Sequence, residues 1–391
     1  MRRVAFAVVA VLVLSVFEVG ATTHATTDAP SEFVRVCPPA EPGYATCFAT
    51  MRRSAKKRKK IKPLTPALIK KIHRWSTSPT AGAGKTIAIV IPFHNPHLES
   101  DLAVFSSRYG LPQCTIANTC LSIVNARGTD PPVDPGWALE GNLDVQWAHA
   151  IAPGAKILVM VASSNLFVDM FHGVWKANEL HPEYLSMSWG GPEFELQGIF
   201  DPVLDPDDPA YDAAGVSHIA ASGDTGGQPT YPSNSPFVTS VGSTSVQLER
   251  RKLKRESGWK HTGGGCSVYE PATPAQAAFP EYAATGCAGR ATPDVVAFGD
   301  VRPGVWTYIS PDTFGSTGGW VNTGATSLSA PMFAGRAAVS GLEVDEELIY
   351  SDTLTFKDIT RGHTLDLNAE NGFPCTVGYD LCSGRGVWIG P

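Results

Sequence analysis

From Thr86 onward the chain alternates short apolar runs with longer stretches whose apolar residues recur at helical spacing. The apolar runs predict buried strands at 87–91, 156–161, 184–189 and 216–221, and the periodic stretches predict helices at 98–109, 138–149 and 166–180. Apolar strands separated by helices are typical of a parallel sheet covered on both faces. The pattern therefore predicts an α/β domain over 81–391, with functional side chains beyond the carboxyl ends of its strands.

The stretch before this domain lacks a comparable core pattern. Residues 26–80 contain several prolines and a basic run from Arg52 to Lys62, and only Leu64 to Trp75 show helical spacing. We interpret 26–80 as a short N-terminal leader or linker, because a run of like charge usually forms a solvated segment. The basic run could equally be a site of proteolytic trimming.

The first residues have the layout of a secretory signal peptide. Two arginines follow Met1, an apolar stretch runs from Val4 to Val19, and small residues follow near Ala21 and Ala25. We assign 1–25 to a signal peptide, with an uncleaved membrane anchor as the alternative. The expected location is extracellular, without stable membrane association once the signal is removed.

Composition fits an exported enzyme-sized domain. Charged residues make up 17% of the sequence and the net charge is -6, which argues against nucleic acid as a main partner and for an ordinary soluble protein, expected as a monomer. The eight cysteines fall in four close pairs: Cys37 and Cys47, Cys114 and Cys120, Cys266 and Cys287, Cys375 and Cys382. Neighbour pairing is the simplest disulfide set, although other connectivities remain open.

One candidate nucleophile lies at the start of a predicted helix. A turn of small residues, 322–326, leads into an apolar helix expected from Ser327 to Gly341. A serine there lies among unpaired backbone N–H groups at the positive end of the helix dipole, which suits a reaction that develops an oxyanion. An ordinary helix cap is the alternative.

One candidate base lies on the predicted helix 138–149. Glu140 and Asp144 are four residues apart, so both carboxylates project from one helix face, beside apolar Leu143, Val145 and Trp147. Paired acids in an apolar site can share a proton, and one of them can serve as a base. Two solvated acids on an exposed face are the alternative.

Four runs, in their order along the chain, resemble the sedolisins, which are secreted serine-carboxyl peptidases. These are Trp137 to Ala155, Ser188-Trp189-Gly190-Gly191, Ala221 to Gly227 with its S-G-D-x-G pattern, and Gly324 to Pro331. The resemblance implies a subtilisin-like three-layer fold, with a central, mostly parallel sheet and helices on both faces. It also implies an endopeptidase active at acidic pH on peptide or protein substrates.

The resemblance assigns a role to each candidate. Ser327 would be the nucleophile, Glu140 the general base, Asp144 the residue that orients Glu140, and Asp224 an oxyanion donor. Ser188, Trp189, Gly190 and Gly191 would border the specificity cleft, where a bound peptide pairs its backbone; a plain turn after a strand is the alternative.

A calcium site is implied near the C-terminus. In sedolisins two loops bind one Ca²⁺ ion through carboxylates and backbone carbonyls, which are the oxygen ligands that this cation prefers. Carried over, the ligands are the side chains of Asp358 and Asp380 and the carbonyls of Ile359, Thr376 and Gly378.

The chain departs from the sedolisin pattern at two of these positions. Ala325 replaces the usual glycine before Thr326-Ser327, and Thr376 replaces a glycine in the calcium loop. Both substitutions leave backbone groups available, so we expect them to be tolerated.

Two rival functions remain. The first is a subtilisin-type peptidase with a histidine base, but Glu140 occupies the helix position where that histidine is expected. The second is a secreted, non-catalytic binding protein that keeps the fold.

Overall fold

The structure is a computed structural model that describes residues 32–53, 62–365 and 372–390, which belong to one compact unit. The expected signal peptide, 1–25, and most of the basic run lie outside the described residues. No helix in the described part of the chain is long and apolar enough to cross a membrane.

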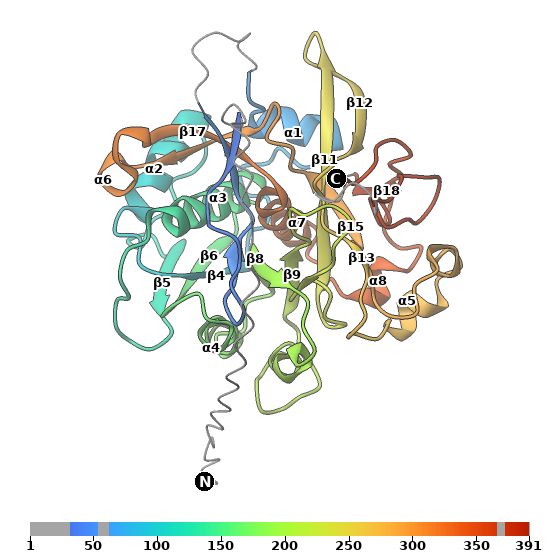
Figure 1. Cartoon of the computed structure of the whole chain (residues 1–391). Helices are drawn as coiled ribbons and strands as arrows, with labels where there is room; N and C mark the ends of the chain where they lie inside the picture. Colours follow the sequence, from blue (N-terminus) through green and yellow to red (C-terminus); the bar gives the residue numbers. More distant parts are fainter. Residues whose placement is uncertain (1–31, 54–61, 366–371, 391) are drawn as a thin grey trace, which may run out of the picture. The chain divides into compact units, whose positions relative to one another are not determined.

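A ten-stranded sheet runs through the middle of this unit (Figure 1). Its order is β18 (Phe356–Lys357), β19 (Val387–Trp388), β15 (Val295–Phe298), β11 (Thr239–Glu249), β9 (Ser217–Ala221), β7 (Tyr184–Met187), β4 (Thr86–Pro92), β6 (Lys156–Ala162) and β5 (Leu121–Asn125), with β12 (Lys252–Gly258) paired to β11. The strands from β19 to β5 are parallel, whereas β18 and β12 are antiparallel to their neighbours. The expected mostly parallel sheet is confirmed.

Helices cover both faces of this sheet. Helix α3 (Pro135–Ile151) packs at Gly141 against Ile91 of β4, and α4 (Phe167–Asn178) packs at Gly173 against Val90. Because neighbouring residues of a strand point to opposite faces, α3 and α4 lie on opposite sides of the sheet. Helix α7 (Thr326–Ser340) packs beside α3 on β7, β9 and β11, and α2 (Leu98–Tyr109) packs outside α3. The three-layer α/β fold is therefore confirmed.

The apolar run 184–189 does not form one strand. Strand β7 ends at Met187, and β8 (Trp189–Pro192) joins a separate three-stranded sheet between β10 (Thr230–Tyr231) and β2 (Thr46–Cys47). The expectation of a single strand is corrected: the chain leaves the central sheet at Ser188.

Residues 32–53, which the sequence assigns to a leader or linker, form part of the domain; we call them the strap. They contain β1 (Phe33–Arg35), β2 and β3 (Thr50–Arg52), and the disulfide between Cys37 and Cys47 closes the loop between β1 and β2. Strand β3 pairs with β17 (Gly319–Gly324), which pairs in turn with β16 (Val305–Ile309). In Figure 1 the blue strap runs in front of α3 and reaches β8. Its strands are too short for alternation to reveal them in the sequence.

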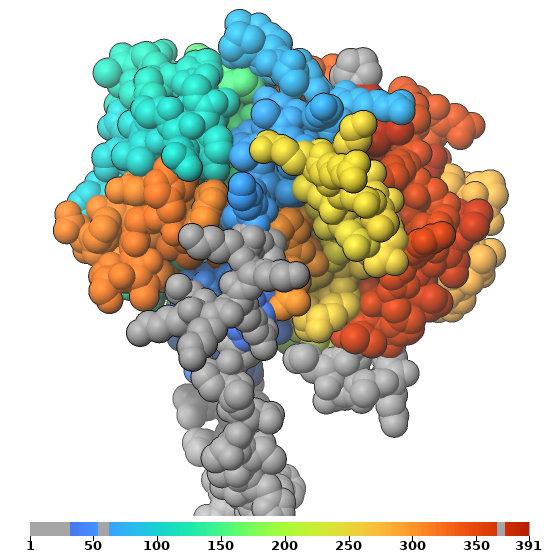
Figure 2. Space-filling view, turned by 90° about the horizontal axis from the view of Figure 1, so that it is seen from above, coloured from blue at the N-terminus to red at the C-terminus, as the bar shows by residue number. Residues whose placement is uncertain are grey.

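The stretch after the strap is also anchored to the body. Helix α1 (Pro66–His73) begins at Thr65, whose hydroxyl accepts a hydrogen bond from the amide of Leu68. The ring of His73 contacts Glu256 of β12 at 3.0 Å, and Lys357 donates to the same carboxylate at 2.7 Å. Figure 2 shows the yellow β12 hairpin between the blue α1 region and the red C-terminal segment. One buried carboxylate thus connects three distant stretches of the chain.

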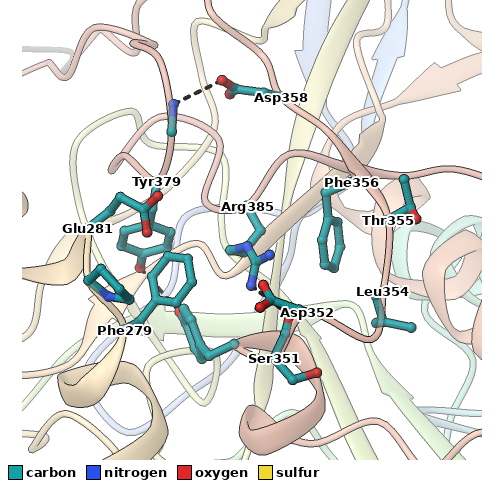
Figure 3. Close-up of a pocket in the computed structure, with 13 residues that line it drawn as sticks. Phe279, Glu281, Ser351, Asp352, Leu354, Thr355, Phe356, Asp358, Tyr379 and Arg385 are labelled. Carbon is teal, nitrogen blue, oxygen red and sulfur yellow. Dashed lines mark hydrogen bonds between the residues drawn. The ribbon is translucent and has the colours of Figure 1, made fainter.

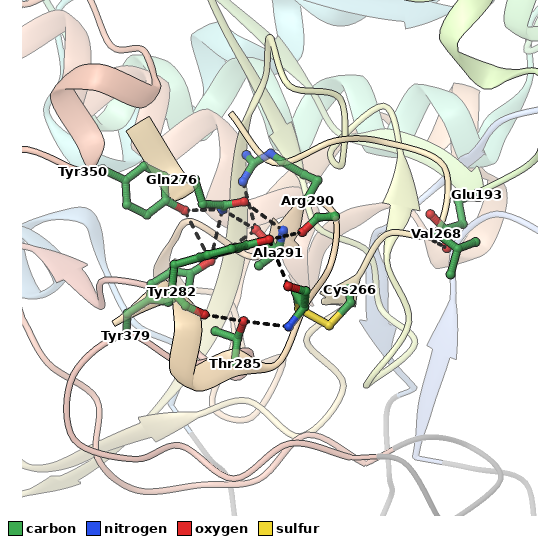
Figure 4. The surroundings of a disulfide bond; sticks show 12 residues. Glu193, Cys266, Val268, Gln276, Tyr282, Thr285, Arg290, Ala291, Tyr350 and Tyr379 are labelled. Atoms are coloured by element: carbon green, nitrogen blue, oxygen red, sulfur yellow. Dashed lines mark hydrogen bonds between the residues drawn. A yellow bond between two sulfur atoms is a disulfide. The ribbon is translucent and has the colours of Figure 1, made fainter. Parts of the chain in front are cut away.

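All four neighbour disulfides predicted from the cysteine spacing are confirmed. The bond between Cys266 and Cys287 lies beside a buried polar network (Figure 4). In that network Arg290 donates to both carboxylate oxygens of Asp294 and to Glu346. Asp294 also accepts from the amide of Ser240 at the start of β11, so the network fixes the loop that leads into β15.

Candidate active site

The two candidate acids are buried against the helix that carries the candidate nucleophile. Glu140 and Asp144 on α3 and Ser327 on α7 are all fully buried. The packing of α3 against α7 brings these side chains together. The alternative of two solvated acids on an exposed helix face is therefore wrong.

Ser188 connects the acids to the nucleophile. The hydroxyl of Ser327 donates to the backbone carbonyl of Ser188 at 3.2 Å, and the hydroxyl of Ser188 donates to Asp144 Oδ1 at 2.7 Å. The Ser188 hydroxyl also lies 3.3 Å from the carbonyl oxygen of Ser327. That carbonyl lacks its usual partner in the helix because Pro331, four residues on, has no N–H. The hydroxyl and carbonyl of Ser188, where the chain leaves the central sheet, thus lie at the start of α7.

Burial keeps the acid pair from ionising fully. Desolvation raises the pKa of Glu140 well above its ordinary value, the neighbouring Asp144 raises it further, and the nearby Ser327 hydroxyl lowers it. Desolvation also raises the pKa of Asp144, against the hydrogen bond from Ser188. Among the described residues, neither Glu140 Oε1 nor Asp144 Oδ2 has a hydrogen-bond partner. Burial therefore favours a pair that keeps one proton and carries one charge.

Asp224 completes this group from the loop after β9. Its Oδ1 atom accepts hydrogen bonds from the amide and the hydroxyl of Thr326, at 3.0 and 2.7 Å. Desolvation raises the pKa of Asp224 to about 7, although the bonds from Thr326 lower it. Its Oδ2 atom has no hydrogen-bond partner in the part of the chain that the structure describes. A protonated Asp224 can therefore donate from Oδ2 to another group.

Ala325, just before this helix, has a backbone conformation that alanine rarely adopts. Its φ is 92° and its ψ is -172°, in a region that is almost restricted to glycine. The substitution at this position keeps the expected chain path, but at a conformational cost.

The expected substrate-binding run begins at Ser188, which contacts Asp144, and continues as β8, the middle strand of a three-stranded sheet. Gly190 has no room for a side chain, because a Cβ atom would collide with the carbonyl oxygen of Tyr231 and lie 3.2 Å from the ring of Phe48. Thr46 pairs with Gly190 and Cys47 pairs with Trp189, so β2 of the strap lies along one side of β8. Gly191 pairs on its other side with Tyr231.

The strap also contacts the candidate catalytic residues, which the sequence did not reveal. The amide of Ala49 donates to Glu140 Oε2 at 3.0 Å, and the amide of Phe48 donates to the carbonyl of Ser188 at 3.2 Å. The side chain of Thr50 and the charge of Arg35 both lower the pKa of Asp224. The Cys37 and Cys47 pair was the only sign in the sequence that this stretch is ordered.

The expected calcium ligands gather elsewhere, in loops near the C-terminus. Asp358 accepts from the amide of Gly378 at 2.9 Å, and Asp380 accepts from the amide of Thr376 and, at 2.8 Å, from the amide of Ser383. The hydroxyl of Ser383 lies 3.4 Å from the carbonyl of Ile359. The expected ligand atoms are all oxygens, which is the type of ligand that Ca²⁺ prefers. Backbone amides already donate hydrogen bonds to the Asp380 carboxylate.

A cavity of about 600 Å³ adjoins these loops (Figure 3). The guanidinium of Arg385 lies against two aromatic walls, 4.5 Å from the ring centre of Phe279 and 5.2 Å from that of Phe356. Asp358 and Gly378 belong to its lining, whereas the four candidate catalytic residues do not. This cavity is a neighbour of the calcium loops and not of Ser327.

Known proteins match both the sequence and the fold. The profile of the subtilase family matches residues 135–347. Kumamolisin of Bacillus sp. (strain MN-32) is 29% identical over 337 residues, which cover 79% of this chain and 59% of that protein. Tripeptidyl-peptidase 1 of Bos taurus is 26% identical over 374 residues, covering 83% and 62% of the two chains. The chain thus spans about six-tenths of the length of these relatives.

A solved structure shares the architecture. Pseudomonas sedolisin, described as a serine-carboxyl proteinase complexed with two molecules of pseudo-iodotyrostatin, superposes with a TM-score of 0.69 at 22% identity, over 84% of this chain and 95% of that one. Because the family profile covers more than half of the chain, the chain belongs to the subtilase family, and its resemblance to the sedolisins is confirmed.

Proposed function

We propose that this chain is a secreted serine-carboxyl endopeptidase, which hydrolyses peptide bonds through an acyl-enzyme on Ser327 at acidic pH. The observation that carries the proposal is the buried acid pair of Glu140 and Asp144 at the start of the helix that holds Ser327. Peptides or proteins would be the substrates.

The proposed reaction uses carboxylate oxygen atoms that have no hydrogen-bond partner among the described residues. Ser327 Oγ attacks the substrate carbonyl carbon while Glu140 takes its proton, and Asp144, which keeps the proton of the acid pair, leaves Glu140 ionised for this transfer. The developing oxyanion accepts a hydrogen bond from protonated Asp224 Oδ2, near the positive end of α7. Glu140 then gives the proton to the departing amine. Water hydrolyses the ester by the same steps, which restores Ser327.

A histidine base is less well supported. His149 is on the same helix as Glu140, but its Nε2 atom contacts the carbonyl of Pro112 at 2.9 Å. In the proposed site, Glu140 stands at the helix position where such a base is expected. The subtilisin-type alternative therefore has no supporting contact on this helix.

An endopeptidase fits the path of the strap better than an enzyme that trims chain ends. The strap continues on both sides of Glu140, pairing with β8 before Ala49 and with β17 after it. A substrate that follows the same path would continue on both sides of the cleaved bond, so internal peptide bonds would fit this site. The disulfides fit an oxidising, extracellular location, and one Ca²⁺ ion is proposed at Asp358 and Asp380.

Replacing the nucleophile tests this function, with a neighbouring serine as control. Ser327→Ala should lower peptide hydrolysis by roughly 10⁴–10⁶-fold and abolish labelling by a fluorophosphonate probe. Ser329→Ala removes another fully buried hydroxyl of α7, which contacts Ser243 at 2.8 Å, and should keep turnover. Undiminished hydrolysis by Ser327→Ala would refute the proposal.

A further inference from the structure

We propose that the hairpin of residues 245–256, which we call the basic hairpin, binds a polysaccharide whose repeating units carry sulfate groups. This surface lies outside the candidate active site, and its binding role goes beyond the proposed function. Such binding would hold the protein on an anionic matrix.

The basic hairpin stands clear of the central sheet. Strand β11 pairs with β9 over residues 239–241 and with β15 over residues 241–244. Among the described strands, only β12 pairs with the rest of β11. The yellow hairpin projects from the body of the molecule in Figure 1. A partner can therefore reach its tip without entering the candidate active site.

The tip of the hairpin concentrates positive charge. Five of the six residues from 250 to 255 are arginine or lysine, and all five are exposed. Lys254 lies 3.5 Å from Glu249, which is the only exposed acid of this hairpin; the other four cations form no ion pair with the described residues. The whole chain has a net charge of -6, so the rest of the chain is more acidic than the whole. The hairpin is thus a local cationic surface on an acidic protein.

One face of the hairpin is anchored to the body, which leaves the other face for a partner. Val246 packs in the core, and the buried Glu256 opposite it contacts His73 at 3.0 Å. The next pair, Gln247 and Arg255, points the other way, because neighbouring residues of a strand face opposite sides. Arg255 is therefore exposed on a ribbon whose backbone is already held in place.

The turn of the hairpin has arginines where other residues are less strained. Glu249 pairs with Lys252, so Arg250 and Arg251 form a two-residue turn, with φ of 48° and 63°. Such turns need a positive φ at both positions and favour Asn-Gly, because larger side chains are strained there. A binding role gives a reason for two guanidinium groups at this tip.

The cations of the tip match sulfate groups in chemistry. Guanidinium groups donate paired hydrogen bonds to oxyanions, and they stay charged over the whole pH range in which proteins fold. Sulfate esters also keep their charge at the acidic pH of the proposed function, whereas carboxylates with ordinary pKa values of about 4 begin to lose it. The preference for sulfate over carboxylate therefore rests on that proposed function.

Two other polyanions fit the hairpin less well. Proteins that lie on a membrane usually insert apolar side chains, but no large apolar residue of the described hairpin is exposed. A nucleic-acid duplex is wide and carries phosphates on two strands, so it would bring the acidic body close to like charge. A single polysaccharide chain can contact the tip alone.

The basic hairpin extends from the same edge of the central sheet as the candidate active site. Strands β7, β9 and β11 are parallel, and the hairpin follows the part of β11 that pairs within the sheet. Ser188 follows β7 and Asp224 comes after β9, at the carboxyl ends of these strands. A protein held by this hairpin therefore turns the edge that carries its candidate active site toward the matrix.

The test measures binding of heparin, a sulfated polysaccharide, to the full chain in the Ser327→Ala form, which avoids self-digestion. Arg250→Asn together with Arg251→Gly removes two charges and introduces the residues that this turn prefers. The double variant should bind heparin roughly tenfold more weakly, and the slope of log Kd against log salt concentration should fall by about one for each arginine removed. Unchanged affinity in this variant would overturn the inference.

The matched control is Arg250→Lys together with Arg251→Lys, which alters the same two residues but keeps their charges, so it should retain the salt dependence of the parent. Thermal melts should show that both double variants fold. Hyaluronate, which carries only carboxylates, duplex DNA and vesicles of anionic phospholipid serve as competitors. Any of them that binds as tightly as heparin overturns the assignment of a sulfated polysaccharide.

Casein hydrolysis by the enzyme with an intact Ser327 separates this inference from the proposed function. Arg250→Asn with Arg251→Gly should leave hydrolysis unchanged, because neither arginine belongs to the candidate active site. A chain that degrades casein but does not bind heparin overturns this inference alone. A chain that binds heparin through the hairpin but hydrolyses no peptide overturns the proposed function alone.

Discussion

In the proposed mechanism, three buried carboxyl groups have different roles because their hydrogen-bond partners differ. Asp224 Oδ1 accepts two bonds from Thr326, and burial raises the pKa of this group to about 7. Burial and the charge of Asp144 raise the pKa of Glu140. The proposed mechanism needs an ionised Glu140 and a protonated Asp224, so activity should rise with pH as Glu140 ionises and fall above about pH 7. The rise in activity at low pH should therefore occur at a higher pH than the ordinary pKa of a free glutamate would give.

Two substitutions of Asp224 can show whether this residue causes the fall in activity at high pH. Asp224→Asn keeps an acceptor for Thr326 and offers an amide donor that does not titrate, so the fall in kcat/KM above about pH 7 should disappear. Asp224→Ala offers no donor and should lose about 10²–10³-fold in kcat. An unchanged alkaline limb in Asp224→Asn would show that another group sets it.

Sequence motifs predicted the four candidate catalytic residues, but they did not predict the contacts that the strap makes with them. Glu140, Asp144, Asp224 and Ser327 belong to runs whose spacing resembles the sedolisins, and the fold brings all four together. The contact of Ala49 with Glu140 spans 91 positions and depends on how a short, aperiodic segment packs. Such contacts arise from tertiary structure and have no local sequence signal.

At the scale of elements, the start of α7 combines two unusual residues. Pro331 removes one N–H inside the helix, and Ala325 adopts a positive φ of 92° before it. The cost at Ala325 is on the order of 1–3 kcal/mol. Both features are close to Ser327, so the helix start is held by its neighbours rather than by its own propensity.

The strain at Ala325 predicts a stabilising substitution. Ala325→Gly relieves that conformation but gives the unfolded chain more freedom, so the net gain in unfolding free energy should be about 1 kcal/mol. Chemical denaturation of an inactive Ser327→Ala background, which avoids self-digestion, measures it. As a control, Ala334→Gly in the middle of the same helix should destabilise by about 1 kcal/mol. A lower stability for Ala325→Gly would mean that the alanine side chain contributes packing that outweighs the strain.

Long elements were predictable from the sequence, whereas short or interrupted ones were not. The helix expected at 98–109 matches α2, and the strand expected at 216–221 corresponds to β9. The run 184–189 predicts one strand but belongs to two, because apolar residues continue through the point where the chain changes sheets at Ser188. Periodicity reports burial, and it does not report which sheet buries a residue.

At the scale of the whole molecule, the C-terminal loops close one edge of the central sheet. Strand β19 pairs with β15, and β18 pairs with β19. Asp358 and Asp380 join the loops that flank these short strands. Because such short strands contribute little pairing, the stability of this edge depends on what holds the loops.

We predict that calcium holds these loops, so its removal should lower the melting temperature of the Ser327→Ala protein. An ion present at 100 times its dissociation constant would stabilise the folded state by about 2.7 kcal/mol. Asp358→Ala should abolish the difference between melts with calcium and with chelator. Asp352→Ala, at an exposed acid of the neighbouring cavity, should keep it. If wild-type loops melt alike in both conditions, the amides that donate to Asp380 suffice to hold this edge, and no calcium site exists.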